Sequence, residues 1–158
     1  MTSDQIDALR SLLDRQRVLS LGVLVDASPY VGLLPYAPRA DYGAALIHAS
    51  GLARHSRGLQ DGAPFAVLIH DLLTAESDAL QVPRVSLQGT VELLAKQEPA
   101  YADGRDAYLA RFPSSATTFG LGDFDLYWLH FERGRYVAGF AQAINLNKEN
   151  LRELAATG

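Results

Sequence analysis

Two arginines and a histidine, Arg54, His55 and Arg57, lie within four positions of the stretch HASGLARHSRGL, residues 48–59. The stretch follows the apolar strand pattern AALI, and Ser50 lies where that strand is expected to end. A helix that starts directly after a strand leaves backbone N–H groups free, and these groups and the helix dipole attract anions. Arg54 can add a bidentate contact to a phosphate. The pattern therefore indicates an anion site, and the alternative is an exposed helical turn with solvated charges.

A second polar pattern occurs in PRVSLQG, residues 83–89. Side chains alternate along a strand, so Arg84, Ser86 and Gln88 should share one face and the apolar side chains between them the other. A polar face in the middle of a long strand is either a ligand surface or a solvent-facing side. The pattern alone favours the solvent-facing side.

The histidines do not form a metal-ligand pattern. His48, His55 and His130 lack the spacing of ligands on one helix, and IHD at residues 69–71 has no further His or Asp at a suitable distance. We expect His48 and His130 to be packed or hydrogen-bonded strand residues. The sequence contains no Ser-His-Asp pattern, nucleophile elbow or P-loop, so it predicts no metal site and identifies no catalytic residue.

Composition excludes several classes of protein. The chain has 158 residues, 48% of them hydrophobic, and a net charge of −4, which predicts a single domain over 1–158 and no nucleic-acid partner. It has no cysteine, so it forms no disulfide or thiolate metal site. No apolar run approaches the roughly 20 residues of a membrane span, and the charged N-terminus does not read as a signal peptide. We therefore expect a cytoplasmic protein without a membrane partner.

The periodicity predicts a mainly β (α+β) domain in which short turns join antiparallel strands. A barrel with peripheral helices fits these strands best. Pro35 predicts an edge strand, a bulge or a ligand-facing break, and Gly89 predicts a bulge or a close approach of another backbone segment. Strands are expected at 18–25, 30–38, 44–50, 64–71, 83–95, 124–132 and 136–143, with turns at 26–29 and 134–135. Helices are expected at 3–17 with Ser3 as N-cap, at 51–62, at 98–112 with an interruption near Gly104, and at 147–156 with Asn147 as N-cap.

Four motifs together, in this order and spacing, resemble a known family. They are PYVGLLPYA, ASGLARHSRGLQ, PRVSLQGTVELL and FDLYWLHF followed by YVAGFAQA. Over roughly residues 10–146 the chain resembles the flavin-binding split-barrel superfamily of pyridoxamine 5′-phosphate-oxidase-like proteins, closest to the branch that includes haem-utilisation proteins. The resemblance implies a homodimer of six-stranded antiparallel split barrels with FMN at the dimer interface. Leu126, Trp128 and the stretch 136–140 are then the apolar strand faces expected to need cover from a second copy.

The resemblance also implies a set of cofactor-binding residues. Arg54 and His55 would hold the phosphate, with Ser50 at the strand end. Val31, Gly32 and Leu33 would present strand backbone to the flavin, His48 and Ala49 would line the same cleft, and Arg84 would reach the cofactor from the long strand.

The chain departs from the family pattern at two positions. Related sequences often have serine where Gly32 stands and asparagine where Gly58 stands, so two polar groups are missing from the cofactor region. The haem-utilisation relatives also have C-terminal extensions that contact haem, whereas this sequence stops at Gly158, which counts against haem as the ligand. The Arg and His pair with which vitamin B6 phosphate oxidases bind substrate is not recognisable in RYVAGFAQAINL.

What the resemblance implies about function is an FMN-dependent oxidoreductase that acts on an unknown small molecule. The alternative is a non-enzymatic haem- or flavin-binding or storage protein. A cation near the flavin would favour the anionic reduced form.

Overall fold

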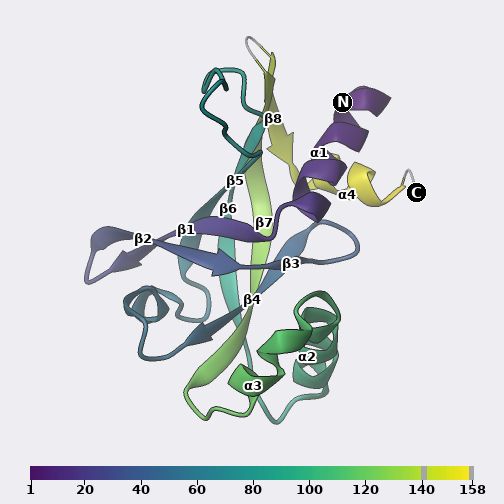
Figure 1. The fold of residues 1–158 in the computed structure, drawn as a ribbon. Coiled ribbons are helices and arrows are strands. Elements are labelled where there is room, and N and C mark those ends of the chain that lie inside the picture. The colour runs from purple at the N-terminus through teal and green to yellow at the C-terminus, as the bar shows by residue number, and fades with distance from the viewer. Residues whose placement is uncertain (140–141, 157–158) are drawn as a thin grey trace.

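Eight strands form one antiparallel sheet in the computed structural model, which describes residues 1–139 and 142–156 (Figure 1). The order along the sheet is β2-β1-β5-β6-β7-β4-β3, and β8 pairs with β7. Within the described residues β2 and β3 do not pair with each other, so the barrel is not closed. The strands are β1 (Val18–Val25), β2 (Ser28–Pro35), β3 (Ala37–Pro38), β4 (Ala44–Ser50), β5 (Pro64–His70), β6 (Arg84–Leu94), β7 (Phe124–Gly139) and β8 (Gln142–Asn147).

The predicted mainly β class with peripheral helices is confirmed. The expected strand 30–38 is divided into β2 and β3, and β7 and β8 stand where strands were expected at 124–132 and 136–143. Pro35 lies in β2, at one end of the sheet order, where a missing N–H donor costs no ladder hydrogen bond. The predicted turn at 26–29 is a two-residue turn at Asp26 and Ala27, whose φ angles of 52° and 62° match the twist of a tight hairpin.

Helices lie at the edges and ends of the sheet. They are α1 (Ser3–Arg15), the 3-10 helix η1 (Arg54–Gly58), α2 (Pro99–Arg111), η2 (Pro113–Ser115), α3 (Ala116–Phe119) and α4 (Lys148–Ala156).

The first and last helices pack together against the same end of the sheet (Figure 1). Helix α1 is capped by Thr2, not Ser3, because the Thr2 side chain and Gln5 form a reciprocal capping box. It also ends at Arg15, two residues earlier than expected. Asn147 caps α4 as predicted, accepting a hydrogen bond from the backbone N–H of Asn150 at 2.9 Å.

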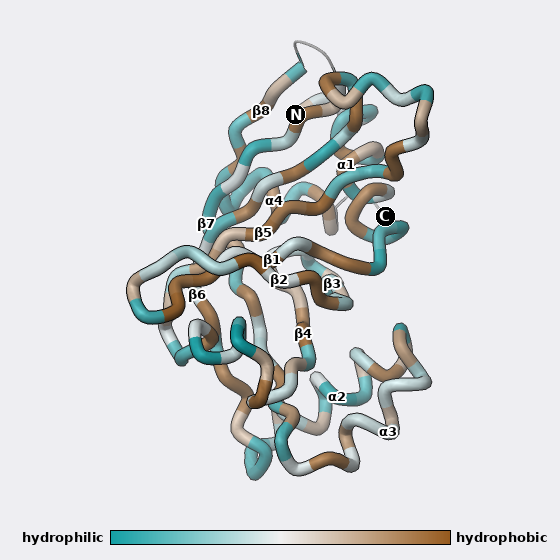
Figure 2. Tube along the Cα trace, turned by 60° about the vertical axis from the view of Figure 1, so that its left-hand side comes forward, coloured by the Kyte–Doolittle hydropathy of each residue, from teal (hydrophilic) through white to brown (hydrophobic). Residues whose placement is uncertain are grey.

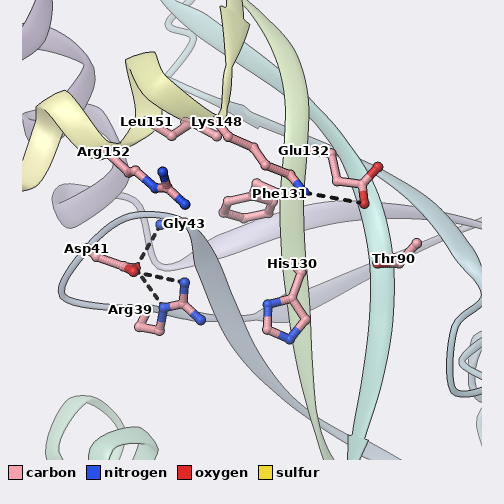
Figure 3. A pocket seen from close by; sticks show the side chains of 10 residues that line it. All are labelled: Arg39, Asp41, Gly43, Thr90, His130, Phe131, Glu132, Lys148, Leu151 and Arg152. Carbon is pink, nitrogen blue, oxygen red and sulfur yellow. Dashed lines mark hydrogen bonds and ion pairs between the residues drawn. The ribbon is translucent and has the colours of Figure 1, made fainter.

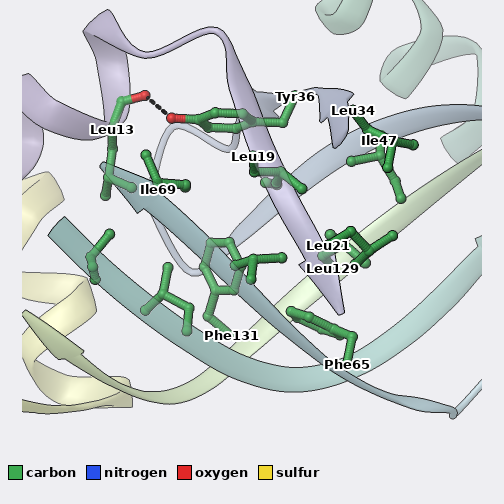
Figure 4. Packing of buried hydrophobic residues seen from close by; sticks show 14 of the residues in the cluster. Leu13, Leu19, Leu21, Leu34, Tyr36, Ile47, Phe65, Ile69, Leu129 and Phe131 are labelled. Carbon is green, nitrogen blue, oxygen red and sulfur yellow. Dashed lines mark hydrogen bonds between the residues drawn. The ribbon is translucent and has the colours of Figure 1, made fainter. Parts of the chain in front are cut away.

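The main hydrophobic core lies inside the curved sheet (Figure 4). Hydrophobic residues follow β1, β4 and β5 through the middle of the molecule (Figure 2). Alternate side chains of the strands point inward, and Leu21, Ile69 and Leu129 are at most 1% exposed. The Tyr36 hydroxyl donates a hydrogen bond to the Leu13 carbonyl at 2.7 Å, which ties the end of β2 to α1.

A second hydrophobic cluster lies on the outer side of β4 and β7, under α2. Helix α2 is continuous through Gly104, so the predicted interruption there is wrong. A Cβ at residue 104 would lie 3.0 Å from Leu94 Cδ1 and 3.1 Å from Leu126 Cδ2. Glycine at this position therefore allows the helix to approach the sheet closely and does not break it.

Strand β7 runs without interruption from Phe124 to Gly139, so the predicted turn at 134–135 is also wrong. Gly134 stays in the strand, where a Cβ would lie 2.4 Å from the Ser86 carbonyl oxygen. Gly139, at the end of β7, pairs with Gln142, at the start of β8, and residues 140–141 of the expected strand lie outside the described residues. The register shifts between Gln88 and Gly89, where β7 has the extra residue Glu132, so the predicted bulge is present at this point of the sheet. A Cβ at residue 89 would overlap the His130 carbonyl, so the backbones of β6 and β7 also approach closely there, as predicted.

Candidate functional site

The Arg- and His-rich stretch forms η1, a 3-10 helix of five residues, and not the longer helix expected at 51–62. So short a helix has almost no macrodipole, and no side chain caps its start. Attraction for an anion must therefore come from side chains. Helix η1 follows β4 and packs on β1 and β2 near the Asp26–Ala27 turn.

The three basic residues of η1 have different environments. Arg57 forms an ion pair with Asp26 at 2.9 Å and is neutralised by it. The His55 ring is half-buried, and desolvation lowers its pKa, so the ring is neutral near pH 7. Arg54 is exposed and has no ion pair within 1–139 and 142–156, and its guanidinium carbon lies 5.5 Å from the centre of the Tyr30 ring. Arg54 is thus the one basic side chain of η1 that is free to meet an anion, as far as the structure describes the chain.

Helix η1 approaches β2 closely at Gly32. A Cβ at residue 32 would lie 2.9 Å from His55 Nδ1, so the imidazole ring occupies the space that a side chain would need. The ring's other nitrogen, Nε2, is buried and has no hydrogen-bond partner among the described residues. Gly58 is equally constrained, since a Cβ there would lie 2.7 Å from the Leu24 carbonyl oxygen. The close packing of η1 against the β1–β2 hairpin therefore explains why both positions are glycine.

Next to Tyr30, an apolar hollow of about 270 Å³ opens between β2, β1 and β5. Tyr30 is one of the residues that line this hollow, and its ring centre lies 5.5 Å from the Arg54 guanidinium carbon. An apolar hollow with a cation next to one of its lining residues suits a ligand that has a flat apolar part and an anionic group. The hollow is lined by Gly22, Val23, Leu24, Pro29, Tyr30, Val31, Pro64, Phe65 and Ala66.

Val31, Gly32 and Leu33 lie in the middle of β2, an edge strand of the described sheet. Val31 and Leu33 point outward and are 66% and 68% exposed. An edge strand has backbone N–H and C=O groups that no neighbouring strand uses. The structure therefore places all three predicted residues beside the hollow or at the accessible edge next to η1.

Ser50 has a structural role in the loop between β4 and η1. Its hydroxyl donates a hydrogen bond to Asp123 Oδ2 at 2.6 Å and accepts one from the Leu52 backbone N–H at 3.2 Å. Its carbonyl oxygen accepts a hydrogen bond from the Ser56 hydroxyl at 2.6 Å. The Ser50 side chain thus positions the start of η1, and the neighbouring Asp123 carboxylate makes its hydroxyl a poor partner for an anion.

The side chains of His48 and Ala49 lie on opposite faces of β4 and do not line one cleft. Ala49 points into the main core. The His48 ring stacks on Phe119, with ring centres 3.8 Å apart, and its Nδ1 lies 3.3 Å from the Thr118 hydroxyl. Burial, together with the charge of Lys96, lowers the pKa of His48 to about 4. The prediction of a packed strand histidine is confirmed.

Arg84 lies at the far end of the sheet from η1. It starts β6 and pairs with His70 at the end of β5, whereas η1 lies near the start of that strand. Its Nη1 donates a hydrogen bond to the Val82 carbonyl at 3.0 Å. The predicted alternation holds, since Ser86 and Gln88 are exposed on the same side. Within one chain, Arg84 and Arg54 cannot contact the same small ligand.

Only part of the apolar surface expected from the sequence is accessible, since Trp128 and residues 137–139 are half-buried. Leu126 is fully buried under α2, and Phe140, the last residue of the expected stretch 136–140, lies outside the described residues. Exposed apolar side chains instead gather on the outer face of β2, β1 and β5. They are Val18 (43% exposed), Leu24 (51%), Val31 (66%), Leu33 (68%) and Leu68 (37%).

Sequence reasoning did not identify Tyr30 or Arg39. Tyr30 directly precedes residues 31–33, whose backbone was predicted to contact the cofactor. Strand alternation could have identified it, because it lies two residues before Gly32 and therefore on the same face of the strand. Arg39 lies in the turn APRADYG and borders a second, charged hollow described below. No group of three or more possible metal ligands occurs in the described part of the chain, and no helix there is long and apolar enough to cross a membrane.

Comparison with known proteins identifies relatives by structure only. No protein-family model and no curated protein match the sequence. A haem-binding protein from Mycobacterium smegmatis is 24% identical, with a TM-score of 0.82 over 97% of this chain and 62% of its own. The present chain therefore spans less than two thirds of that relative. Another solved chain is 30% identical, with a TM-score of 0.74 over 95% of this chain and 97% of its own.

Two further solved structures are similar over nearly their full lengths. A Clostridium acetobutylicum protein of the pyridoxine-phosphate oxidase family, related to general stress protein 26 of B. subtilis, is 12% identical and has a TM-score of 0.67. The similarity extends over 99% of that protein and 96% of this chain. An FAD-binding protein from Mesorhizobium loti is 15% identical, with a TM-score of 0.60 over 87% of this chain and 96% of its own.

Proposed function

Because this chain belongs by its fold to the pyridoxamine 5′-phosphate-oxidase-like split-barrel superfamily, we propose that it binds a phosphorylated flavin, FMN. One observation carries this proposal. Arg54, without an ion pair in the described residues, lies over the ring of Tyr30, which is one of the residues lining an apolar hollow of about 270 Å³. The phosphate would contact Arg54, and the ring system would cover the hollow.

The residues present fit FMN in three respects. The hollow is apolar and open enough to accept one edge of a flat ring system. Arg54 supplies a free guanidinium, which binds phosphate more strongly than a neutral donor does. The free edge of β2 at Val31, Gly32 and Leu33 offers backbone donors and acceptors for the polar edge of the ring. His55, neutral near pH 7, would contribute a hydrogen bond and not a charge.

The site is incomplete in one chain, and this supports a homodimer. The outer face of β2, β1 and β5 leaves several apolar side chains 37–68% exposed, which favours cover by a second copy. A two-fold axis that crosses the strands would bring the Arg84 end of one copy opposite the η1 end of the other. Each ligand would then contact Arg54 from one copy and Arg84 from the second. Both arginines could thus bind the same ligand although they lie far apart within one chain.

When bound, FMN would supply hydride or single-electron chemistry. The chain's own residues would hold the phosphate at Arg54, keep water from the ring through the apolar hollow, and place the cation of Arg84 near the cofactor. No acid or base is assigned. We propose a single-domain, cytoplasmic oxidoreductase that acts on a small molecule.

A second candidate, haem binding without catalysis, is favoured by one observation at His70. The exposed His70 ring donates a hydrogen bond from Nδ1 to the Asp71 carbonyl at 2.6 Å, which leaves Nε2 free as a metal ligand. It borders a hollow of about 100 Å³ lined partly by Leu33, Leu68 and Leu72. Haem binding is also the described property of the M. smegmatis relative.

The absorption spectrum of the purified protein, before and after addition of FMN or haem, separates the two candidates. Bound flavin bands support the first, and a saturable Soret band that His70→Ala abolishes supports the second. A haem spectrum that His70→Ala leaves unchanged would exclude His70 as the ligand.

A further inference from the structure

A second cavity system lies on another side of the molecule from η1, between α4, the turn that joins β3 to β4, and α2. One hollow, of about 350 Å³, is bordered by Arg39, His130 and Arg152 (Figure 3). A neighbouring hollow of about 540 Å³ is lined by Trp128, Leu46 and the small residues of α2. Arg39 lines both hollows, so they adjoin each other at this residue. Together they have the size of a small-molecule site.

The turn after β3 holds the Arg39 side chain in a fixed position. Its Nε and Nη2 donate hydrogen bonds to Asp41 Oδ1 and Oδ2 at 2.6 and 2.9 Å. Asp41 is held in turn by the backbone N–H of Gly43 at 2.9 Å, and the salt bridge to Arg39 lowers the Asp41 pKa. A Cβ at residue 43 would lie 2.8 Å from Arg39 Nη2, so a side chain there would push the guanidinium out of this position. Such a guanidinium is preorganised to bind a ligand.

The polar hollow contains more positive than negative charge. Asp41 already pairs with Arg39, and Glu132 lies 3.9 Å from the Lys148 ammonium. Arg152 extends from α4 towards the same hollow and has no ion pair among the residues that the structure describes (Figure 3). Arg39 Nη1 likewise has no hydrogen-bond partner there. Two guanidinium groups with free donors facing one hollow favour an anion between them.

The adjoining hollow supplies an aromatic wall. The Arg39 guanidinium carbon lies 5.6 Å from the centre of the Trp128 ring, so the cation and the ring form one continuous surface. Gly104 and Ala107 of α2 line the opposite side and leave space for a flat group. Asp103, in the same hollow, repels an anion and so orients it towards Arg39.

We propose that this Arg39–Trp128 groove binds a small aromatic carboxylate. The ring stacks on Trp128 beside α2, and the carboxylate accepts hydrogen bonds from Arg39 and Arg152. The site is separate from the flavin site proposed above, and its test does not depend on that site.

Fluorescence provides a specific test, because Trp128 is the only tryptophan of the chain. The full chain as purified, with its flavin and haem content recorded, is titrated with 4-nitrobenzoate and with the neutral 4-nitrobenzyl alcohol. Both probes quench tryptophan on contact. We expect saturable quenching by the carboxylate, with an affinity at least about ten-fold above that of the alcohol, the scale of a charged hydrogen bond. Linear quenching by both probes, or equal affinities, would overturn the proposal.

Three variants localise the effect. Arg39→Gln should remove the preference for the carboxylate, and Gly43→Ala, which retains all charges, should weaken it by displacing the guanidinium. Arg57→Gln removes an exposed, paired arginine elsewhere and should change nothing. If Gly43→Ala and Arg39→Gln, both shown to be folded by circular dichroism, bind 4-nitrobenzoate as the parent does, the carboxylate does not bind at Arg39 and the proposal fails.

Discussion

The His55 imidazole lies directly against the backbone of Gly32, so closely that a Cβ at residue 32 would be 2.9 Å from Nδ1. Gly32→Ala should therefore displace the ring. We expect the free energy of unfolding to fall by about 1–3 kcal/mol, which is typical of overpacking. The displaced ring should also gain solvent, so its depressed pKa should rise towards the ordinary value. Denaturant titration and NMR titration of the His55 ring measure the two effects. An unchanged His55 pKa would mean that the position and burial of the ring do not depend on glycine at residue 32.

The buried His48 ring makes stability depend on pH. Its pKa is about 4 in the folded state and near 6.5 when unfolded, so the unfolded chain binds the proton first as pH falls. Stability should thus decrease between pH 6.5 and 4, by at most about 3 kcal/mol for this residue. The pKa of His55 is also lowered in the folded state, so His55 should likewise reduce stability as the pH falls.

A matched variant isolates the contribution of His48. His48→Asn cannot titrate in this range, so its unfolding free energy should change less between pH 7 and pH 4 than that of the parent protein. Denaturant melts at several pH values supply the comparison. Parallel pH profiles for the two proteins would show that His48 is accessible and titrates normally.

The outer face of β2 should form the dimer interface. Val31→Glu and Leu33→Lys place charges on side chains that are 66% and 68% exposed in one chain and would be buried in a dimer. We expect each to weaken self-association at least ten-fold, because an unpaired buried charge is costly. Leu121→Lys, at a residue 49% exposed outside this face, is the control.

Sedimentation at micromolar concentration with FMN present measures association for all four proteins. A monomeric parent protein, or dimers that survive both β2 variants, would contradict the interface.

Mixing two defective variants tests whether a site uses both copies. Arg54→Ala and Arg84→Ala should each weaken FMN binding as homodimers. In a heterodimer one site would lose both arginines and the other would keep both. After unfolding and refolding an equimolar mixture, random pairing should restore about a quarter of the high-affinity sites. No restored sites would mean that Arg54 and Arg84 do not act across the dimer.

Strand positions were largely predictable from the sequence, because alternation and turn residues are local signals. The hairpin at Asp26, the edge strand at Pro35 and the bulge at Gly89 all agree with the structure. Two of the errors involve glycine. Gly104 and Gly134 were read as breaks, whereas both allow close approach of a second element, a tertiary effect that sequence spacing does not show.

The candidate site was less predictable. The sequence places Arg54 and Arg57 in equivalent surroundings, and only the fold shows that Asp26 neutralises Arg57. The opposite faces of His48 and Ala49 follow from strand alternation, which could have been applied to them as it was to residues 84–88. The distance between Arg54 and Arg84 depends on strand order, which no local pattern encodes.

Side-by-side titration of FMN and riboflavin into the parent protein, Arg54→Ala and Arg57→Ala most directly tests the central claim that Arg54 is the phosphate contact of a flavin site. Riboflavin lacks the phosphate, and Arg57 provides a matched arginine that is already paired with Asp26. We expect FMN to bind more tightly than riboflavin, and Arg54→Ala to weaken FMN by about 10- to 100-fold with little effect on riboflavin. Arg57→Ala should leave both affinities nearly unchanged. Equal affinities of the parent protein for FMN and riboflavin, or equal FMN affinities in the parent protein and Arg54→Ala, would contradict the account.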